Sequence, residues 1–327
     1  MAQVRYGVLS TARIVRNNHI PSARKASNTA IVAIASREQA RAERCARELG
    51  IPKAYGSYDE LLADAQVDAV INPLPNSLHC AWTVKAAEAG KHVLCEKPFA
   101  MTVAEAQRMI DAARANDVLL MEGFTHRFLP QQQFVRQAID AGEIGQVRVV
   151  RAELTYTLLD WDTDSRARPE LGGGCLMDAG CYCVNQLRFI MGTEPIRVQA
   201  FQRLKEGYGV DATFAGILHF PGDRLAYMCT SMEAPFRGCC EVIGTQGRIE
   251  MPDLFEGTAV RVVTGQGERV QAFEGVDRFM LQIAHFSDCI LHGKQPMISP
   301  EDAKANTAVL VALQQAAREG KAVPVPR

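Results

Sequence analysis

The sequence predicts an α/β protein, with an N-terminal Rossmann-like domain and a C-terminal α+β domain that contains an open, mainly antiparallel sheet. Short β-branched runs alternate with helical stretches of about 12 residues as far as residue 123, a rhythm typical of parallel βαβ units. Beyond that point several strand-like runs follow one another with no helix between them. The length of 327 residues also suits two domains, at about 150 residues each.

The first domain is expected over residues 1–123. An apolar run at residues 4–10 ends in small residues, and the helix-compatible stretch that follows it stops near Pro21. The pattern then repeats in predicted strands at residues 30–36, 68–72, 92–95 and 118–121 and in predicted helices at residues 38–49, 77–89 and 103–115. Right-handed crossovers wind such units into one parallel sheet.

The second domain is expected over residues 124–327. Helices are predicted at residues 131–141 and 179–191, on either side of an alternating run at 147–158. Further strands are predicted at residues 196–201, 212–220, 225–231, 239–243 and 260–263, and two final helices at 280–292 and 300–319. Ser299 and Pro300 suit the N-cap and the first position of the last helix, which can pack back on the first domain.

Charge and composition exclude several classes of partner. The 36 Lys and Arg residues balance 37 Asp and Glu residues, without the basic excess that a nucleic acid or an anionic membrane selects. No apolar run approaches the roughly 20 residues that cross a bilayer, and the first residues lack a signal-peptide pattern, so we expect a cytoplasmic protein. The ten cysteines form no CxxC pair, and we interpret them as reduced core residues, with no metal site.

The predicted second sheet has a broad apolar face. Tyr156, Met228, Cys229 and Met232 fall on its strand-like runs. Helices can cover one side of such a sheet and a second subunit the other. We therefore expect a homodimer or homotetramer that forms through the C-terminal sheet.

The turn after the first predicted strand is the candidate phosphate-binding turn. It contains Ser10, Thr11, Ala12, Arg13 and Ile14. Phosphates bind where a parallel strand leads into a helix, because free N–H groups and the helix dipole favour anions there. Aligned on GxGxxG, the glycine positions hold Ser10, Ala12 and Val15, so the fingerprint is absent, although Ser and Ala are small and hydroxyls can donate to phosphates. A plain βαβ turn that binds no nucleotide fits this segment equally well.

The end of the second strand predicts which dinucleotide would bind. NAD-preferring sites carry an acidic residue there that contacts the ribose 2′-OH. This chain has Ser36 and Arg37, which can bond a 2′-phosphate, with Arg13 as a second contact. NADP(H) is therefore favoured. Glu38 keeps NAD(H) as the alternative, and Arg37 can also be an exposed residue at a helix start.

Three further segments carry a resemblance to a known family. Residues 72–79 (NPLPNSLH) and 95–98 (CEKP) each follow a predicted strand, and residues 172–182 (GGGCLMDAGCY) open a helix. In this order and spacing, the chain resembles the Gfo/Idh/MocA oxidoreductases over nearly its whole length. Tyr182 replaces the histidine of many members and resembles the branch that contains dimeric dihydrodiol dehydrogenases, xylose dehydrogenases and anhydrofructose reductases. The turn without glycines departs from the family pattern.

By resemblance, Lys97 is the active-site lysine, Tyr182 the proton donor or acceptor, and Asp178 a residue that orients sugar hydroxyls or the lysine. The chemistry agrees with these roles. Oxidation of an alcohol needs a base at the oxygen besides the hydride acceptor that a nicotinamide supplies. A neighbouring ammonium stabilises phenolate, so that either Lys97 or Tyr182 can be the immediate proton-transfer group.

The resemblance implies further contacts, each with a plainer alternative. Leu74, Pro75, Asn76 and His79 would line the nicotinamide-ribose end, although Asn76 and His79 also suit a helix cap and a first turn. Glu96 would bind ribose hydroxyls or pair with Lys97. The substrate candidates are Arg166 and Arg168, which can instead be solvated loop residues, and Trp161 and Phe279, which can instead be core residues.

The sequence therefore predicts an NADP(H)-dependent oxidoreductase that interconverts an alcohol or lactol and its carbonyl on a small carbohydrate or polyol. A trans-dihydrodiol dehydrogenase is an alternative within the same class. A non-catalytic protein that senses dinucleotides is an alternative from another class, and Lys97, Asp178 and Tyr182 argue against it because binding alone needs no proton-transfer group.

Overall fold

The computed structural model describes residues 2–326. The chain forms two compact units, each built from two stretches of sequence. The first comprises Met1–Thr125 and Asp277–Lys304, and the second comprises His126–Val276 and Ala305–Arg327. The division expected from the sequence, by contrast, leaves residues 277–304 in the second domain.

The first unit contains a six-stranded sheet in the order β3-β2-β1-β4-β5-β6, and every neighbouring pair is parallel. The strands are β1 (Val4–Val8), β2 (Thr29–Ala35), β3 (Lys53–Tyr55), β4 (Ala69–Asn72), β5 (His92–Cys95) and β6 (Leu120–Glu122). All four residues of β4 are buried, as expected for a central parallel strand that is covered on both faces. The order reverses between β1 and β4, where ligands of such sheets bind beyond the carboxyl ends of the strands.

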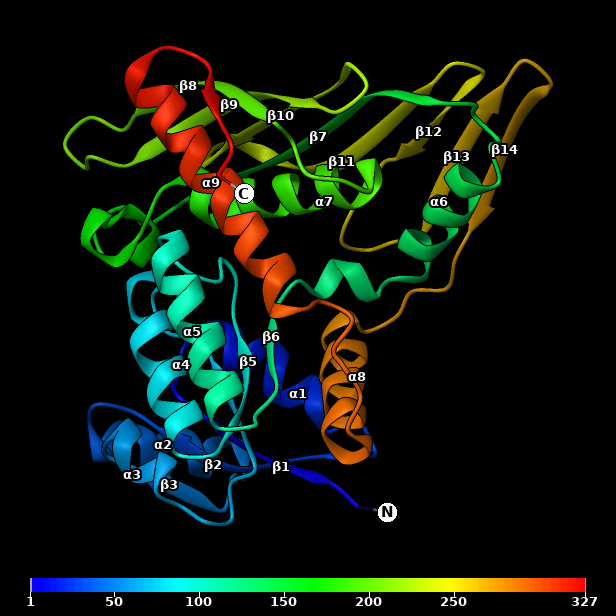
Figure 1. The fold of residues 1–327 in the computed structure, drawn as a ribbon. Coiled ribbons are helices and arrows are strands. Elements are labelled where there is room, and N and C mark those ends of the chain that lie inside the picture. Colours follow the sequence, from blue (N-terminus) through cyan, green and yellow to red (C-terminus); the bar gives the residue numbers. More distant parts are fainter. Residues whose placement is uncertain (1, 327) are drawn as a thin grey trace. The chain divides into compact units, whose positions relative to one another are not determined.

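Helices cover this sheet (Figure 1). They are η1 (Val15–His19), α1 (Ile20–Ala23), α2 (Gln39–Leu49), α3 (Tyr58–Leu62), η2 (Asn76–Leu78), α4 (His79–Glu88), α5 (Val103–Ala115) and α8 (Arg278–His292). Helix α8 belongs to this unit because it packs on α1, β1 and β2. The helical stretch ends at Ala23, two residues after Pro21 and close to the stop expected from the sequence.

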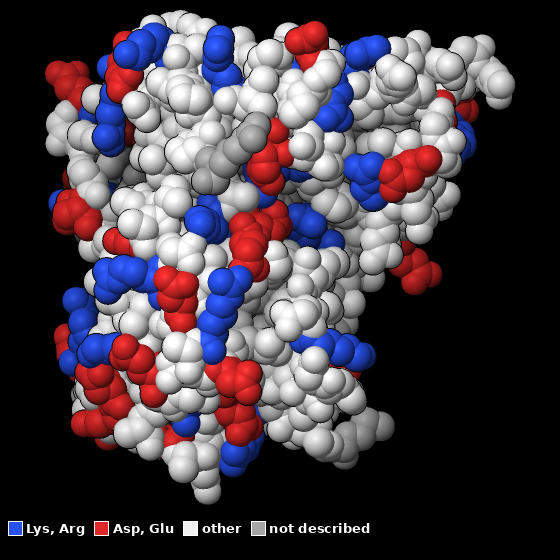
Figure 2. All heavy atoms as spheres, in the orientation of Figure 1, with Lys and Arg blue, Asp and Glu red and all other residues white. Residues whose placement is uncertain are grey.

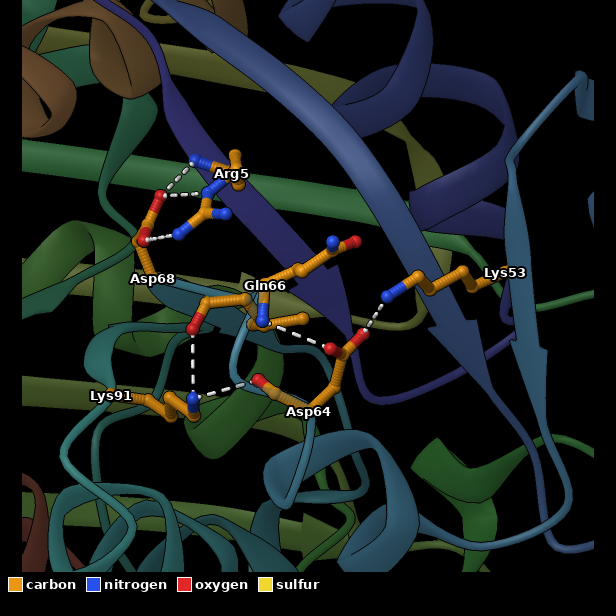
Figure 3. Close-up of polar contacts among 7 residues, drawn as sticks. Arg5, Lys53, Asp64, Gln66, Asp68 and Lys91 are labelled. Atoms are coloured by element: carbon orange, nitrogen blue, oxygen red, sulfur yellow. Dashed lines mark hydrogen bonds and ion pairs between the residues drawn. The ribbon is translucent and has the colours of Figure 1, made fainter.

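Ion pairs tie together the amino ends of the strands (Figure 3). Arg5 at the start of β1 binds Asp68 through its backbone N–H at 2.8 Å and through its guanidinium. Lys53 pairs with Asp64 at 2.7 Å, and the buried Lys91 ammonium donates to the carbonyl oxygens of Asp64 and Val67. These contacts stabilise the edge of the sheet opposite to the one where ligands bind, so we assign them to the fold.

The second unit contains a nine-stranded sheet in the order β14-β13-β12-β11-β7-β10-β9-β8-β15. It is antiparallel except for the parallel pair of β10 with β7, which confirms the mainly antiparallel sheet predicted from the sequence. The strands are β7 (Val147–Thr157), β8 (Arg197–Leu204), β9 (Asp211–Phe220), β10 (Arg224–Ser231), β11 (Glu233–Gly244), β12 (Gly247–Met251), β13 (Ala259–Thr264), β14 (Gly267–Ala272) and β15 (Val323–Pro324).

Helices lie on one face of this second sheet, which leaves the other face open (Figure 1). They are α6 (Pro130–Asp140), η4 (Ser165–Ala167), η5 (Pro169–Leu171), η6 (Leu176–Gly180) and α7 (Cys181–Met191), while η3 (Thr125–Phe128) and α9 (Pro300–Glu319) join the two units along the chain. Tyr156 and Met228 point to the helical face, where Tyr156 reaches η6 and Met228 lies under Gly180. The half-buried Cys229 follows the buried Met228 on β10 and therefore points to the open face. The sequence-based expectation of one shared face for these side chains is thus wrong.

Acidic and basic side chains alternate over the molecular face drawn in Figure 2. This mixed pattern agrees with the formal net charge of −1. Within residues 2–326, no helix combines the length and the apolar character that crossing a bilayer requires.

Candidate active site

The turn after β1 is held by its own side chains. The Ser10 hydroxyl oxygen accepts the N–H of Ala12 at 3.0 Å, and the Ala12 carbonyl accepts the N–H groups of Val15 and Arg16 at 3.1 and 3.2 Å. The chain therefore starts to wind at Ala12 without glycines. Thr11 is buried, Ile14 is half-buried and Arg13 is exposed.

Two arginines, Arg37 and Arg41, lie beside this turn. Only Arg37 is a candidate from the sequence. Ser36 is buried at the end of β2, and Arg37 is exposed next to it. Arg41 on α2 donates from Nε to the Thr11 hydroxyl at 2.8 Å, so that α2 and the phosphate-binding turn are joined. Its local sequence carries no signal for this contact, because Arg37 precedes α2 and Thr11 lies 30 residues before Arg41.

An aromatic pair adjoins the two arginines. The rings of Tyr58 and Trp82 meet edge to face, with centroids 4.8 Å apart. Burial raises the pKa of Tyr58, and the positive charges of Arg37 and Arg41 oppose that shift, so both guanidiniums lie near its phenol. Two cations, hydroxyls and flat apolar rings together suit a phosphorylated adenosine.

His79 connects the two loops that follow β4 and β5. Its ring nitrogens lie 2.8 Å from the carbonyl oxygens of Leu74 and Pro98, and the side chain is fully buried. Burial lowers the pKa of His79, while the bonds to the two carbonyls oppose this shift. His79 thus ties these two loops together. Pro75 and Asn76 are half-buried and Leu74 is buried.

A buried pair fixes the segment that carries Lys97. Nε2 of His19, in the last position of η1, lies 2.7 Å from Oε1 of Glu96. The other carboxylate oxygen accepts the backbone N–H of Lys97 at 3.2 Å. Burial opposes the charged form of Glu96, but the bond from His19 and the charge of Lys97 bring its pKa below the usual value. Lys97 is half-buried, and the bond to Pro98 is cis.

Phe279 on α8 packs against this pair. Its ring meets the imidazole of His19 edge to face at 5.1 Å, and the Arg278 guanidinium lies 5.4 Å from the ring centroid. The phenyl ring thus packs against His19, and it is half-buried. The sequence analysis did not single out His19, because nothing in its local pattern points to Glu96.

In the second unit, a run of glycines allows the chain to approach a buried carboxylate. Gly174 has φ +107°, and a Cβ atom there would lie 2.1 Å from Oδ1 of Asp211. Oδ2 of Asp211 accepts the N–H of Leu176 at 2.7 Å and the thiol of Cys175 at 3.1 Å. This carboxylate, which the sequence analysis missed, holds the start of η6 in place.

Tyr182 lies in the first turn of α7, directly after η6. Its half-buried ring meets the rings of His126 and Phe255 edge to face, at 5.4 and 5.2 Å. His126 is itself buried. A phenol inside an aromatic frame is held in one orientation, as a proton-transfer group must be.

Asp178 on η6 is held by two donors. Its Oδ2 accepts the Tyr156 hydroxyl at 2.5 Å and Nε of Arg166 at 3.0 Å. Arg166 also contacts Asp164, whose Oδ1 lies 3.2 Å from Nη1. Burial and the charge of Asp178 raise the pKa of Tyr156, so this phenol remains a donor. Tyr156 is a further site residue, which the sequence placed on the second sheet and not in the site.

The remaining substrate candidates lie on an outer part of the same loop. The Trp161 ring contacts that of Tyr208 at 5.4 Å and the Lys205 ammonium at 4.8 Å, and Tyr208 donates to Asp162 at 2.8 Å. Arg168 is exposed and donates to the backbone carbonyl of Asp162. Its contacts match the alternative of a solvated loop arginine.

The residues proposed from the sequence thus gather in two groups. Those of the first unit, apart from Phe279 on α8, follow the carboxyl ends of the neighbouring strands β2, β1, β4 and β5, which form one edge of the parallel sheet. Those of the second unit, apart from Trp161 and Arg168, surround η6 and the start of α7.

Family models match both parts of the chain. The model described as "Oxidoreductase family, NAD-binding Rossmann fold" matches residues 4–124, and that of the "GFO/IDH/MocA C-terminal domain" matches residues 132–250.

Curated relatives and a solved structure are similar over almost the full length. The D-xylose 1-dehydrogenase (NADP(+)) 2 of Haloferax volcanii is 36% identical, over 97% of this chain and 98% of its own. The trans-1,2-dihydrobenzene-1,2-diol dehydrogenase of Xenopus laevis is 31% identical, over 94% and 96%. The crystal structure of aldose-aldose oxidoreductase from Caulobacter crescentus, complexed with glycerol, has a TM-score of 0.92 at 29% identity and covers 98% of this chain and 99% of that one.

These matches agree with the observed fold and with its parallel sheet, whose carboxyl edge is the expected ligand-binding edge. The chain belongs to the Gfo/Idh/MocA family of oxidoreductases and is a dehydrogenase or reductase with an NAD-binding Rossmann domain.

Proposed function

We propose that the protein is an NADP(H)-dependent oxidoreductase that interconverts an alcohol or lactol and its carbonyl on a small carbohydrate or polyol. The observation that carries this proposal is the buried His19–Glu96 pair, which fixes Lys97 just beyond the carboxyl end of β5. An ammonium held at the ligand-binding edge of a Rossmann sheet is suited to act on a reacting oxygen.

The chain's residues fit the dinucleotide. The Ser10–Ala12 bond shapes the turn where a helix start offers N–H groups to a pyrophosphate. Ser36, Arg37 and Arg41 supply a hydroxyl and two guanidiniums for a 2′-phosphate, which supports NADP(H) over NAD(H). The Haloferax volcanii relative is named for NADP(+), which agrees with this preference. When bound, the nicotinamide supplies the hydride chemistry.

The proton transfer is assigned to Tyr182 and Lys97. Tyr156 is unsuited to it, because its pKa is raised and its hydroxyl donates to Asp178. Either Tyr182 or Lys97 gives or takes the proton at the substrate oxygen, and a cation beside a phenol favours its phenolate form. Asp178 accepts hydrogen bonds from substrate hydroxyls.

Oxidation of trans-dihydrodiols is a second candidate. The Xenopus laevis relative carries that name, and the Phe255 ring edge-on to Tyr182 suits a flat, apolar substrate. A substrate panel separates the two candidates, because aldoses and dihydrodiols differ in apolar area.

The test combines a titration with turnover. NADPH and NADH are titrated into the protein, and a panel of aldoses, keto-sugars and dihydrodiols is then assayed with the preferred cofactor in its oxidised or reduced form. Tight NADPH binding with turnover of a sugar supports the proposal. Turnover of dihydrodiols alone selects the second candidate, and a protein that binds neither dinucleotide contradicts both.

We also propose that the open face of the second sheet joins two copies in a homodimer or homotetramer. Phe201, Ile217 and Leu225 on this face are 70%, 54% and 45% exposed. They line an apolar groove together with Val149 and Tyr227. Contiguous exposed apolar side chains on a sheet commonly mark a protein interface.

A further inference from the structure

We propose that Tyr156, Asp164, Arg166 and Asp178 form a polar lock at the base of the loop of residues 158–171, and that this loop selects uncharged polyhydroxyl substrates against phosphorylated ones. The inference rests on the proposed function, for which it specifies the substrate class. The guanidinium of Arg166, a substrate candidate from the sequence, already binds two carboxylates of its own chain.

The lock is formed by donors that converge on one carboxylate oxygen. The Tyr156 hydroxyl, from β7, and Nε of Arg166, from η4, both bind Oδ2 of Asp178. The side chain of Asp178 is 15% exposed and that of Arg166 is 41% exposed, so the carboxylate is shielded from water while the guanidinium partly faces solvent. Because β7 precedes the loop and η6 follows it, these contacts join both ends of the loop to a residue inside it.

Arg166 is engaged by two carboxylates. Besides its contact with Asp178, its Nη1 lies 3.2 and 3.5 Å from the two oxygens of Asp164. Asp164 in turn accepts the backbone N–H of Arg166 at 2.9 Å. The charge of Asp178 is the main cause that raises the pKa of Arg166. The single positive charge of this guanidinium faces the negative charges of two carboxylates. The net charge of the cluster is therefore negative, and it repels a phosphate.

The rest of the loop has the same sign of charge. Apart from the lock residues, residues 158–171 contain Asp160, Asp162, Glu170 and Arg168, a net charge of −2. The second arginine, Arg168, donates to the carbonyl of Asp162 on the outer part of the loop. Lys205, the cation nearest to Trp161, is paired with Glu233 at 2.8 Å. A ligand here meets carboxylate acceptors and the Asp178 oxygens, which suit hydroxyl hydrogens.

The chain offers a matched pair of variants for the lock. Tyr156→Phe removes a phenol hydroxyl that donates to an aspartate in the second unit. Tyr55→Phe removes the same kind of bond, to Asp64 at 2.9 Å, in the first unit. By hydrogen exchange followed by mass spectrometry, we expect amides of residues 158–171 to exchange roughly tenfold faster in Tyr156→Phe and unchanged in Tyr55→Phe. Equal exchange in both variants and the wild type overturns the lock.

Substrate selection is measured with a neutral aldose and the same aldose carrying a terminal phosphate. We expect kcat/KM for the neutral sugar to be higher by about 100-fold, and this ratio to shrink as NaCl is raised, because salt screens the repulsion. Asp162→Asn, which lies outside the lock, should lower the ratio severalfold by removing one negative charge. A phosphorylated sugar that is used equally well or better overturns the inference.

Failure of the proposed function gives a different result. In that case neither sugar is oxidised, while hydrogen exchange still separates Tyr156→Phe from Tyr55→Phe. Such an outcome overturns the substrate selection together with the proposed function and supports the lock as a structural feature alone.

Discussion

Nε2 of His19 lies 2.7 Å from Oε1 of Glu96, and the two side chains are only 2% and 10% exposed. The other oxygen of the same carboxylate accepts the N–H of Lys97. A residue of the first helical segment thus controls the position of the lysine to which we assign a role in proton transfer. Removing one partner of a buried pair leaves the other without compensation, which is costly.

The first prediction follows from this pair. His19→Phe should lower the free energy of unfolding by about 3 kcal/mol, because it leaves the Glu96 carboxylate buried without its donor. It should also reduce kcat at least about tenfold by releasing the Lys97 segment. His19→Gln, which keeps a donor, should recover most of the lost kcat. Chemical denaturation and steady-state kinetics measure both effects, and equal kcat in the two variants would contradict a positioning role.

Much of the fold could be predicted because the central strands leave a strong local pattern. The runs around β1, β2, β4 and β5 are mainly apolar, with Arg5 as the charged exception in β1, as expected for strands covered on both faces. The missed elements lack such a pattern. Strand β3 has three half-buried residues, and all six residues of β14 are exposed, so neither has an apolar period to detect.

The site residues could be predicted only in part, because only some of them lie in recognisable local motifs. Lys97, Asp178 and Tyr182 were named because short motifs around them resemble a family. His19, Arg41 and Tyr156 were missed, because each acts through a contact that only the folded chain creates. Their partners are Glu96, Thr11 and Asp178, at separations of 77, 30 and 22 residues. No local period encodes such pairs.

The second prediction concerns the proton-transfer groups. Lys97→Ala and Tyr182→Phe should each lower kcat about 100-fold or more, while the Kd for NADPH stays within a few-fold, because acid-base catalysis acts in the chemical step. Tyr55→Phe, which removes only the bond to Asp64, is the control and should keep normal kcat. Stopped-flow hydride transfer and NADPH titration give the two quantities. Turnover like that of the wild type in either site variant would contradict the assignment.

The third prediction concerns cofactor preference. Arg37→Ala and Arg41→Ala should each weaken NADPH binding roughly 10- to 100-fold, the effect of one charge-assisted hydrogen bond, and leave NADH binding nearly unchanged. Arg47→Ala is the control, since Arg47 is an exposed residue of the same helix whose ion pair is with Glu43. Fluorescence titrations with both dinucleotides measure the Kd values. Equal losses for NADPH and NADH would show that these arginines do not meet the 2′-phosphate.

The fourth prediction tests the subunit interface. Phe201→Glu combined with Ile217→Lys should convert the oligomer to monomers, because charged groups are costly to bury on an apolar face. Val270→Glu, on the exposed strand β14, is the control and should not change the molar mass. Size-exclusion chromatography with light scattering measures it. A wild-type protein that is monomeric at all concentrations would contradict the proposed interface.

The last prediction is a pH dependence of stability. The hydrogen bond from Lys53, with further donors at Gln66 and Tyr55, lowers the pKa of Asp64 from 3.8 to about 2. The unfolded chain therefore binds this proton more readily than the folded one, so the stabilisation is present above pH 4 and is lost as the pH falls toward 2. Asp64→Asn should lower Tm at pH 5 to 7, and its Tm should approach that of the wild type near pH 2. Thermal melts followed by circular dichroism measure the difference, and a gap in Tm that stays constant down to pH 2 would show that the Asp64 charge does not contribute.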